Sequence, residues 1–121
     1  QAGYQATKAL LDKGCRFTAI FATADVMAIG AIRALGDAGK RVPEDISLMA
    51  FENPGVSEFQ RPSLTTIASP LRETAEKAVE LVLADELDGL QKIELSNTLI
   101  ERNSVIALKP ESRKGIHHVA L

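Results

Sequence analysis

Short apolar runs alternate along the chain with longer stretches in which apolar residues recur every three or four positions. A short apolar run bounded by turn residues is typical of a buried strand, and the longer spacing is typical of an amphipathic helix. In the stretch 25–38, for example, Ile29, Ile32 and Leu35 fall on one stripe. The pattern predicts helices at 1–13, 25–38 and 70–88, and strands at 17–22, 46–51, 64–67, 92–102 and 104–108.

Glycine and proline mark the boundaries of these elements. Gly14 and Gly39 end the first two helices, and Pro70 is expected as the first helical residue behind a Ser69 N-cap. Residues 53–63 contain two prolines and a glycine and are expected to form a surface loop. Residues 1–110 are expected to form the folded part, and the polar residues 111–121 a frayed tail.

The order of the predicted elements indicates an α/β fold in which helices flank a parallel sheet. The early strands are almost continuously apolar, as expected for parallel strands covered on both faces. Ligands of such sheets bind outside the carboxyl ends of the strands. Asp25 follows the first strand and Glu52 ends the second, so both are candidate ligand contacts.

Each of these carboxylates has an alternative interpretation. Asp25 can cap or begin the helix that follows it, where its charge favours the helix dipole, with or without a ligand contact. Glu52 can be a solvated loop residue, although no periodic helix follows it. At a strand end, it could accept hydrogen bonds from two adjacent hydroxyls of a sugar. The pair could also serve an enzyme as acid and base.

Composition narrows the class of protein. The 121 residues fit one domain at most, and with 4% aromatic residues and no Trp the core must be aliphatic. A net charge of −2 gives no sign of a nucleic-acid-binding surface within these residues. Cys15 is the only cysteine, which excludes an internal disulfide and fits a reducing compartment. We expect it to be a buried, inert thiol.

The motifs of common enzymes are missing from the sequence. It contains no glycine-rich phosphate loop, no Cys/His metal cluster and no nucleophile elbow. His117 and His118 are adjacent in the tail, where a solvated end is a simpler interpretation than a metal site. No apolar stretch approaches the roughly 20 residues that span a bilayer. We therefore expect no catalytic residue, no cofactor, no metal and no membrane contact.

Four motifs occur in a fixed order: ADVMAIGA at Ala24–Ala31, GKRVPEDIS at Gly39–Ser47, AFEN at Ala50–Asn53 and PSLTT at Pro62–Thr66. Together they resemble the effector-binding domain of the lactose/galactose-repressor family of bacterial transcription regulators. The resemblance extends from about Ala2 to Leu108.

The resemblance implies the C-terminal lobe of a periplasmic-binding-protein-like (type I) fold for residues 3–67. The helix at 70–88 would belong to an N-terminal lobe that is missing here, as is the DNA-binding helix-turn-helix. Glu52 falls on the family's sugar-contacting Asp, and Ala24 on its usual Asn. The expected ligand contacts are Ala24, Asp25, Glu52, Ser69 and Leu71.

The resemblance also implies a homodimer. The family's subunit contact matches the helix at 25–37 and the loop Val56–Arg61, and it points to Ile29, Arg33, Phe59 and Gln60. Ile29 and Phe59 could instead be ordinary core or loop anchors. The apolar stripe of the helix at 70–88 is expected to pair with a second copy, with folding back onto its own sheet or partial disorder as alternatives.

By this resemblance, the chain is the effector-sensing fragment of a cytoplasmic, sugar-responsive transcription regulator. A sugar or sugar derivative would close two lobes, and this movement would change how the dimer presents its DNA-binding heads to the operator. A solute-binding receptor of the same fold and a sugar-active enzyme are the alternatives. A helix-turn-helix upstream of Gln1 would favour the regulator, and a cleaved signal sequence the receptor.

Overall fold

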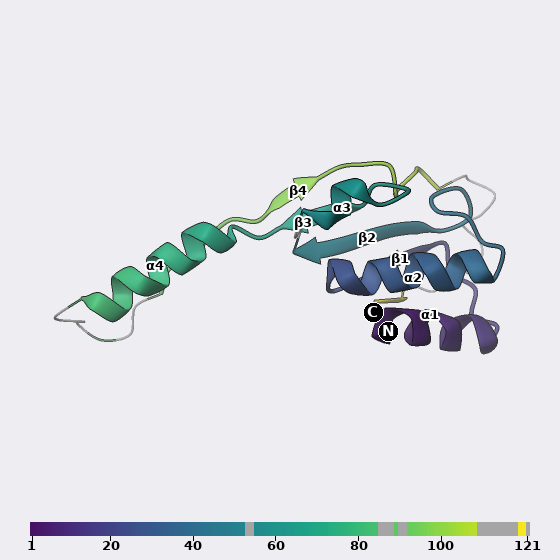
Figure 1. Ribbon diagram of the computed structural model, residues 1–121, viewed down its shortest axis with the longest axis horizontal. Helices are drawn as coiled ribbons and strands as arrows, with labels where there is room; N and C mark the ends of the chain where they lie inside the picture. The colour runs from purple at the N-terminus through teal and green to yellow at the C-terminus, as the bar shows by residue number, and fades with distance from the viewer. Residues whose placement is uncertain (53–54, 85–88, 90–91, 109–118, 121) are drawn as a thin grey trace.

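A five-stranded, mostly parallel sheet organises the chain (Figure 1). The computed structural model describes residues 1–52, 55–84, 89, 92–108 and 119–120. Strands β1, β2, β3 and β5 run parallel, β4 is antiparallel to β3, and the order across the sheet is β4-β3-β2-β1-β5. The strands are β1 (Ala19–Phe21), β2 (Ser47–Glu52), β3 (Thr65–Ala68), β4 (Thr98–Ile100) and β5 (Val119–Ala120).

Four helices accompany the sheet. They are α1 (Ala2–Asp12), α2 (Asp25–Asp37), α3 (Val56–Phe59) and α4 (Leu71–Leu83). Helix α2 packs on the sheet and α1 packs along α2, whereas α4 projects away from the sheet as an arm (Figure 1). The α/β class and the parallel sheet predicted from the sequence are therefore confirmed, and within the described residues no helix is long and apolar enough to cross a membrane.

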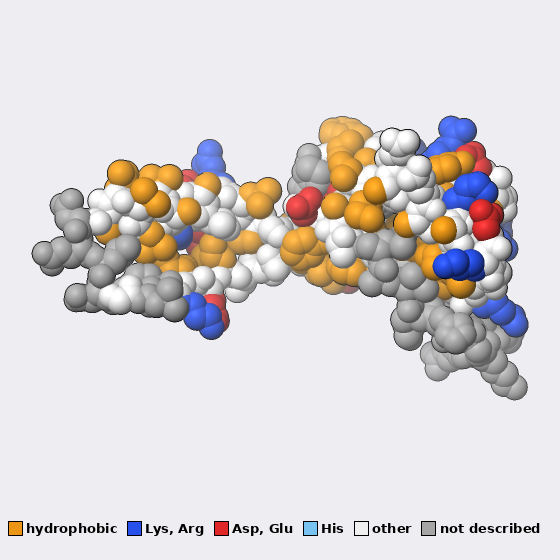
Figure 2. Space-filling view, turned by 90° about the horizontal axis from the view of Figure 1, so that it is seen from below, with side chains coloured by type: hydrophobic (Ala, Val, Ile, Leu, Met, Phe, Trp, Pro, Cys, Tyr) orange, Lys and Arg blue, Asp and Glu red, His pale blue; other side chains and the backbone are white. Residues whose placement is uncertain are grey.

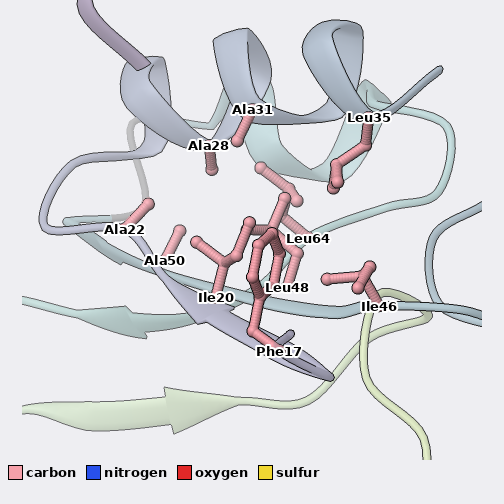
Figure 3. Packing of buried hydrophobic residues seen from close by; sticks show 10 residues of the cluster. All are labelled: Phe17, Ile20, Ala22, Ala28, Ala31, Leu35, Ile46, Leu48, Ala50 and Leu64. Carbon is pink, nitrogen blue, oxygen red and sulfur yellow. The ribbon is translucent and has the colours of Figure 1, made fainter. Parts of the chain in front are cut away.

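The hydrophobic core lies between α2 and the strands (Figure 3). Ala28, Ala31 and Leu35 of α2 point toward the strand side chains, and the small alanines let the helix approach the sheet closely. Apart from Phe17, the buried cluster is aliphatic, as the composition predicted. Its members are Phe17, Ile20, Ala22, Ala28, Ala31, Leu35, Ile46, Leu48, Ala50 and Leu64.

Two glycines allow α1 and α2 to pack backbone against backbone. A Cβ at Gly3 would lie 2.1 Å from the carbonyl oxygen of Met27, and a Cβ at Gly30 would lie 2.7 Å from the amide nitrogen of Tyr4. These distances are shorter than any van der Waals contact, and both neighbours are backbone atoms that cannot move aside. The crossing of the two helices therefore depends on glycine, which has no Cβ, at both positions.

Ser104 joins β2 to β3 at the start of their ladder, where Met49 and Thr65 are the first paired residues. Its carbonyl accepts from the Leu48 amide at 2.8 Å, and its buried hydroxyl donates to the Leu48 carbonyl at 2.5 Å. The same hydroxyl accepts from the Thr65 amide at 2.8 Å. The strand predicted at 104–108 is thus wrong. The segment is joined to β2 by hydroxyls instead of a continuous ladder, since the Ser47 hydroxyl also accepts from the Ile106 amide and donates to the Ile106 carbonyl.

The arm formed by α4 exposes an apolar stripe (Figure 2). Leu71, Val79, Val82 and Leu83 are all more than half exposed, with Val82 at 82%. The alternative that this helix folds back onto its own sheet is wrong, since α4 is a regular helix pointing away from it; the pairing of its stripe with a second copy stays a prediction. The predicted Ser69 N-cap is also wrong: Pro70 occupies that position, and its carbonyl accepts from the Thr74 amide.

Several predicted boundaries differ from the structure. The expected loop at 53–63 contains the short helix α3, and the expected strand at 92–102 is limited to β4. Cys15 is exposed, not buried, because it lies in the turn that follows α1, directly after the left-handed Gly14. Val119 and Ala120 pair with β1, whereas the other residues of the expected tail lie outside the described residues. The predicted end of the last helix at 85–88 and the histidine pair lie outside the described residues.

The close crossing of α1 and α2 gives a matched pair of variants within one helix. Gly30→Ala should lower the free energy of unfolding by about 1–3 kcal/mol, because its methyl group meets the Tyr4 backbone. Gly36→Ala should instead raise it by up to about 1 kcal/mol, because nothing lies within 4 Å and alanine is the better helix former. Urea denaturation followed by circular dichroism measures both; equal effects of the two changes would contradict the backbone-to-backbone packing.

Candidate functional site

The carboxyl ends of β1, β2 and β3 meet at one edge of the sheet. Phe21, the last residue of β1, is paired with Met49, so Ala50, Phe51 and Glu52 extend β2 beyond β1 by about 10 Å at about 3.3 Å per residue. Glu52 is in turn paired with Ala68, the last residue of β3. The register therefore brings the segments that follow β1 and β3 to the same edge as Glu52, as the sequence predicted.

Glu52 occupies a strained backbone conformation at this edge. Its φ is 105°, a positive value that an L-residue with a Cβ rarely adopts. The pairing with Ala68 holds the residue in the ladder despite this strain, and its side chain is exposed. Strained non-glycine residues of this kind concentrate at functional sites, because elsewhere glycine would relieve the cost. The backbone therefore singles out the same residue as the sequence pattern did.

Asp25 is fully buried and faces the interior of the domain. One carboxylate oxygen accepts a hydrogen bond from the Thr66 hydroxyl at 2.8 Å, and the other accepts one from the Ser57 hydroxyl. Ala24 holds the N-cap position of α2, and the helix has no side-chain cap. Asp25 is thus a first-turn residue that joins α2 to α3 and β3, a placement that favours a structural role over direct contact with a ligand.

The other predicted ligand contacts lie around the same edge. Ala24 is half-buried between β1 and α2, and its methyl group offers no hydrogen bond. Ser69 is half-buried, and its carbonyl accepts from the Leu71 amide at 2.8 Å, which turns the chain sharply from β3 into α4. Leu71 is exposed at the base of the arm. Glu52 is therefore the exposed charged side chain among the five predicted contacts.

The four predicted interface residues have different environments. Phe59 on α3 is 77% exposed, and Arg33 on α2 is exposed as well. Ile29 packs against the core, so the interpretation as a core anchor fits it better than a surface contact. Gln60 is half-buried.

Arg33 is engaged within its own helix. Its Nε lies 2.9 Å from a carboxylate oxygen of Asp37, and the Tyr4 hydroxyl donates to the other oxygen at 3.1 Å. These hydrogen bonds, from Arg33 first and Tyr4 second, hold the pKa of Asp37 below its usual value. The ion pair fixes one end of the guanidinium while leaving the side chain at the surface.

Sequence reasoning missed the hydroxyls that position these elements. Ser57 and Thr66 are both fully buried and both donate to Asp25. Thr66 could have been noticed as a polar residue within a buried strand, which requires a polar partner. Ser57 lies in the stretch that was expected to be a loop, and no sequence signal distinguishes it there.

A groove of about 550 Å³ lies at the opposite edge, beside the amino ends of β1 and β2. It mixes apolar residues such as Pro43, Ile106 and Leu108 with Lys40 and Glu44. No group of His, Cys, Asp or Glu within the described part of the chain is arranged to hold a metal ion.

Comparison with known proteins identifies relatives of this chain. The family model "Periplasmic binding protein-like domain" matches residues 1–105. The transcriptional regulator MalR of Clostridium butyricum is 42% identical over 103 residues, which cover 84% of this chain and 31% of MalR. The chain thus spans about a third of the length of the curated relatives it matches.

Solved structures show the same fold. A lac repressor dimer bound to operator and the anti-inducer ONPF matches with a TM-score of 0.81 and 32% identity, covering 87% of this chain and 37% of that one. A LacI family regulator from Enterococcus faecium with bound ribose matches with a TM-score of 0.74 and 37% identity, covering 88% and 40% respectively.

The strain at Glu52 is testable with two variants that both remove the carboxylate. Glu52→Gly should have a free energy of unfolding about 1 kcal/mol higher than Glu52→Ala, because only glycine adopts the positive φ without a steric cost. Thermal and urea denaturation of both proteins measure the difference. A Glu52→Ala protein at least as stable as Glu52→Gly would show that the backbone is not strained there.

Proposed function

Because the chain belongs to the periplasmic binding protein-like domain family, we propose that it is the effector-sensing part of a DNA-binding transcription regulator. The family that the four motifs indicated is confirmed, since the relatives above are transcription regulators and include LacI-family members. The observation that supports effector sensing best is Glu52, an exposed carboxylate on a strained strand end at the edge where such folds bind ligands.

The chemistry of this edge favours a ligand rich in hydroxyls. A carboxylate can accept two hydrogen bonds from adjacent hydroxyl groups, and a charged acceptor makes these bonds stronger than neutral ones. The Enterococcus faecium relative was solved with ribose, which is a ligand of this class. We propose a sugar or sugar derivative as the effector, held by Glu52 with Ala24, Ser69 and Leu71 around it.

Asp25 has an indirect part in this proposal. Its carboxylate is buried under the turn that carries Ala24, and both of its oxygens are occupied by hydroxyls of the protein itself. It would keep the start of α2 in register with β3, so that Ala24 and the strand ends retain their relative positions. We therefore assign it to support of the ligand site instead of contact with the ligand.

The arm suggests how the site is closed. Four large apolar side chains of its stripe are more than half exposed, and exposed apolar patches commonly mark interaction sites. The chain also spans only about a third of the length of its relatives. We propose that a second lobe of a longer protein covers the stripe and forms the other wall of a ligand cleft. Binding would then bias the relative position of the two lobes, which is a two-state element able to couple effector and DNA.

We further propose that the regulator is a homodimer that acts in the cytoplasm and catalyses no reaction. The related lac repressor structure is a dimer bound to operator. In this chain, Phe59 is a large aromatic side chain held out into solvent on a short helix, and Arg33 is an exposed cation on α2. Contact with DNA would be made by another part of the regulator.

Loss of the Glu52 charge tests the effector site. In the full-length regulator, Glu52→Gln should weaken effector binding by up to about 1.5–3 kcal/mol, which is the typical contribution of a hydrogen bond to a charged group. Titration calorimetry against a panel of pentoses, hexoses and disaccharides measures the affinity. The control Glu44→Gln makes the same change at the opposite edge of the sheet and should bind as the unaltered protein does. Equal affinities of both variants would exclude Glu52 from the site.

Phe59 tests the subunit contact. Phe59→Ser in the full-length regulator should raise the dimer dissociation constant at least about tenfold, since truncation of a buried interface aromatic typically costs 1–2 kcal/mol or more. Sedimentation velocity over a dilution series measures this constant. Leu108→Ser, an apolar-to-serine change at the opposite edge, is the control and should leave it unchanged. If Phe59→Ser sediments as the unaltered protein does, the proposed interface is wrong.

A further inference from the structure

Asp25 is the junction of three elements that are distant in the sequence. It lies in the first turn of α2, and its two oxygens accept hydrogen bonds from Ser57 of α3 and Thr66 of β3. All three side chains are fully buried. A buried carboxylate is costly unless it is hydrogen-bonded, and here both oxygens are satisfied. The cluster therefore fixes the relative positions of α2, α3 and β3.

Helix α3 depends on this cluster more than its neighbours do. It has four residues, too few to form a stable helix without tertiary contacts. Within the described residues, the hydrogen bonds that tie α3 to other elements both involve Ser57. Its hydroxyl donates to Asp25, and its carbonyl accepts from the Leu64 amide at 2.9 Å. Ser57 is therefore the attachment point of α3.

Exposed apolar residues are close in sequence to both partners of this buried hydrogen bond. Val26 directly follows Asp25 and is 65% exposed; Val56 directly precedes Ser57, and Phe59 follows it by two positions. The Asp25–Ser57 hydrogen bond thus connects two segments that each present apolar groups to solvent. Holding α3 in place also holds Phe59 in place, because Phe59 is the last residue of this four-residue helix and lies two positions after Ser57.

We propose that Asp25 and Ser57 are positioning residues for the subunit contact: their hydrogen bond sets where α3 presents Phe59 to a second copy of the chain. This inference rests on the dimer proposed above. The occupant of the surface is a second copy because Phe59 on α3 and Val26 on α2 are each well exposed, and the related lac repressor, on which the proposed dimer rests, is itself a dimer. Asp25 and Ser57 make no contact with the partner themselves, since both are buried within one chain.

The choice of a carboxylate fits this role. A carboxylate accepts hydrogen bonds at both oxygens, which matches two hydroxyl donors that approach from opposite elements. An amide at the same position would offer one acceptor and one donor group, so one hydroxyl would have to rotate and accept. Asp25→Asn should therefore loosen α3 while leaving the size of the buried side chain almost unchanged.

A double-mutant cycle in the full-length regulator tests the inference. Ser57→Ala, Phe59→Ala and the combined variant are compared by sedimentation over a dilution series, with circular dichroism to establish that each is folded. Ser57→Ala should raise the dimer dissociation constant about tenfold, and the combined variant should be no weaker than Phe59→Ala alone. Ser63→Ala is the matched control, because the Ser63 hydroxyl makes no hydrogen bond within the described residues and should leave the constant unchanged.

The outcomes separate this inference from the proposed function. If Phe59→Ala weakens the dimer and Ser57→Ala does not, or if their effects add, the positioning role is overturned and the dimer stands. If Phe59→Ala itself has no effect, the interface and this inference both fail, whereas effector affinity in the same samples still tests the ligand site. Asp25→Asn provides a second route if Ser57→Ala does not fold, and it should also give about a tenfold weakening that does not add to Phe59→Ala.

Discussion

The parallel pairing of β1, β2 and β3 is the constraint on which the rest of this structure depends. Because the strands run in the same direction, every segment that leaves a carboxyl end emerges at one edge of the sheet. The register then carries β2 past the end of β1 and places Glu52 beside Ala68. The candidate ligand edge thus results from backbone hydrogen bonds between the strands, not from contacts among the candidate site residues.

Hydroxyl groups satisfy the polar requirements of an otherwise aliphatic domain. Ser104 completes hydrogen bonds between β2 and β3, and Ser57 and Thr66 neutralise the cost of burying Asp25. Each is fully buried and replaces a contact that a regular ladder or an ion pair would otherwise supply. Short hydroxyl side chains suit this task because they bring a donor and an acceptor into the core with little added volume.

The arm and the sheet differ in how they obtain stability. The sheet and α2 enclose a buried cluster, whereas α4 has no buried residue of its own. Its stripe of leucines and valines has the periodicity of a core-facing helix. An apolar stripe without buried residues is expected for a helix that packs against another part of a longer protein. The local sequence of α4 therefore agrees with the two-lobe arrangement proposed for the regulator.

The sequence by itself predicted the α/β class, the order of the main elements, the aliphatic core and the candidate edge with Glu52. These features follow from apolar periodicity and from the position of polar residues at strand ends, which are local properties of the chain. Four ordered motifs added the family, but they could not tell a ligand contact from a buried support at Asp25.

Only the tertiary structure revealed the hydrogen-bond partners of Asp25, because Ser57 and Thr66 lie more than thirty positions away in sequence. It likewise placed Ile29 against the core, left Cys15 exposed, and replaced the strand expected at 104–108 with a segment joined to β2 by the hydroxyls of Ser47 and Ser104. The positive φ of Glu52 is likewise a feature that the sequence did not predict. It arises where pairing with β3 overrides the preference of a non-glycine residue for negative φ. Periodicity reports which face of an element is apolar, whereas burial and hydrogen-bond partners depend on what the rest of the chain brings to that face.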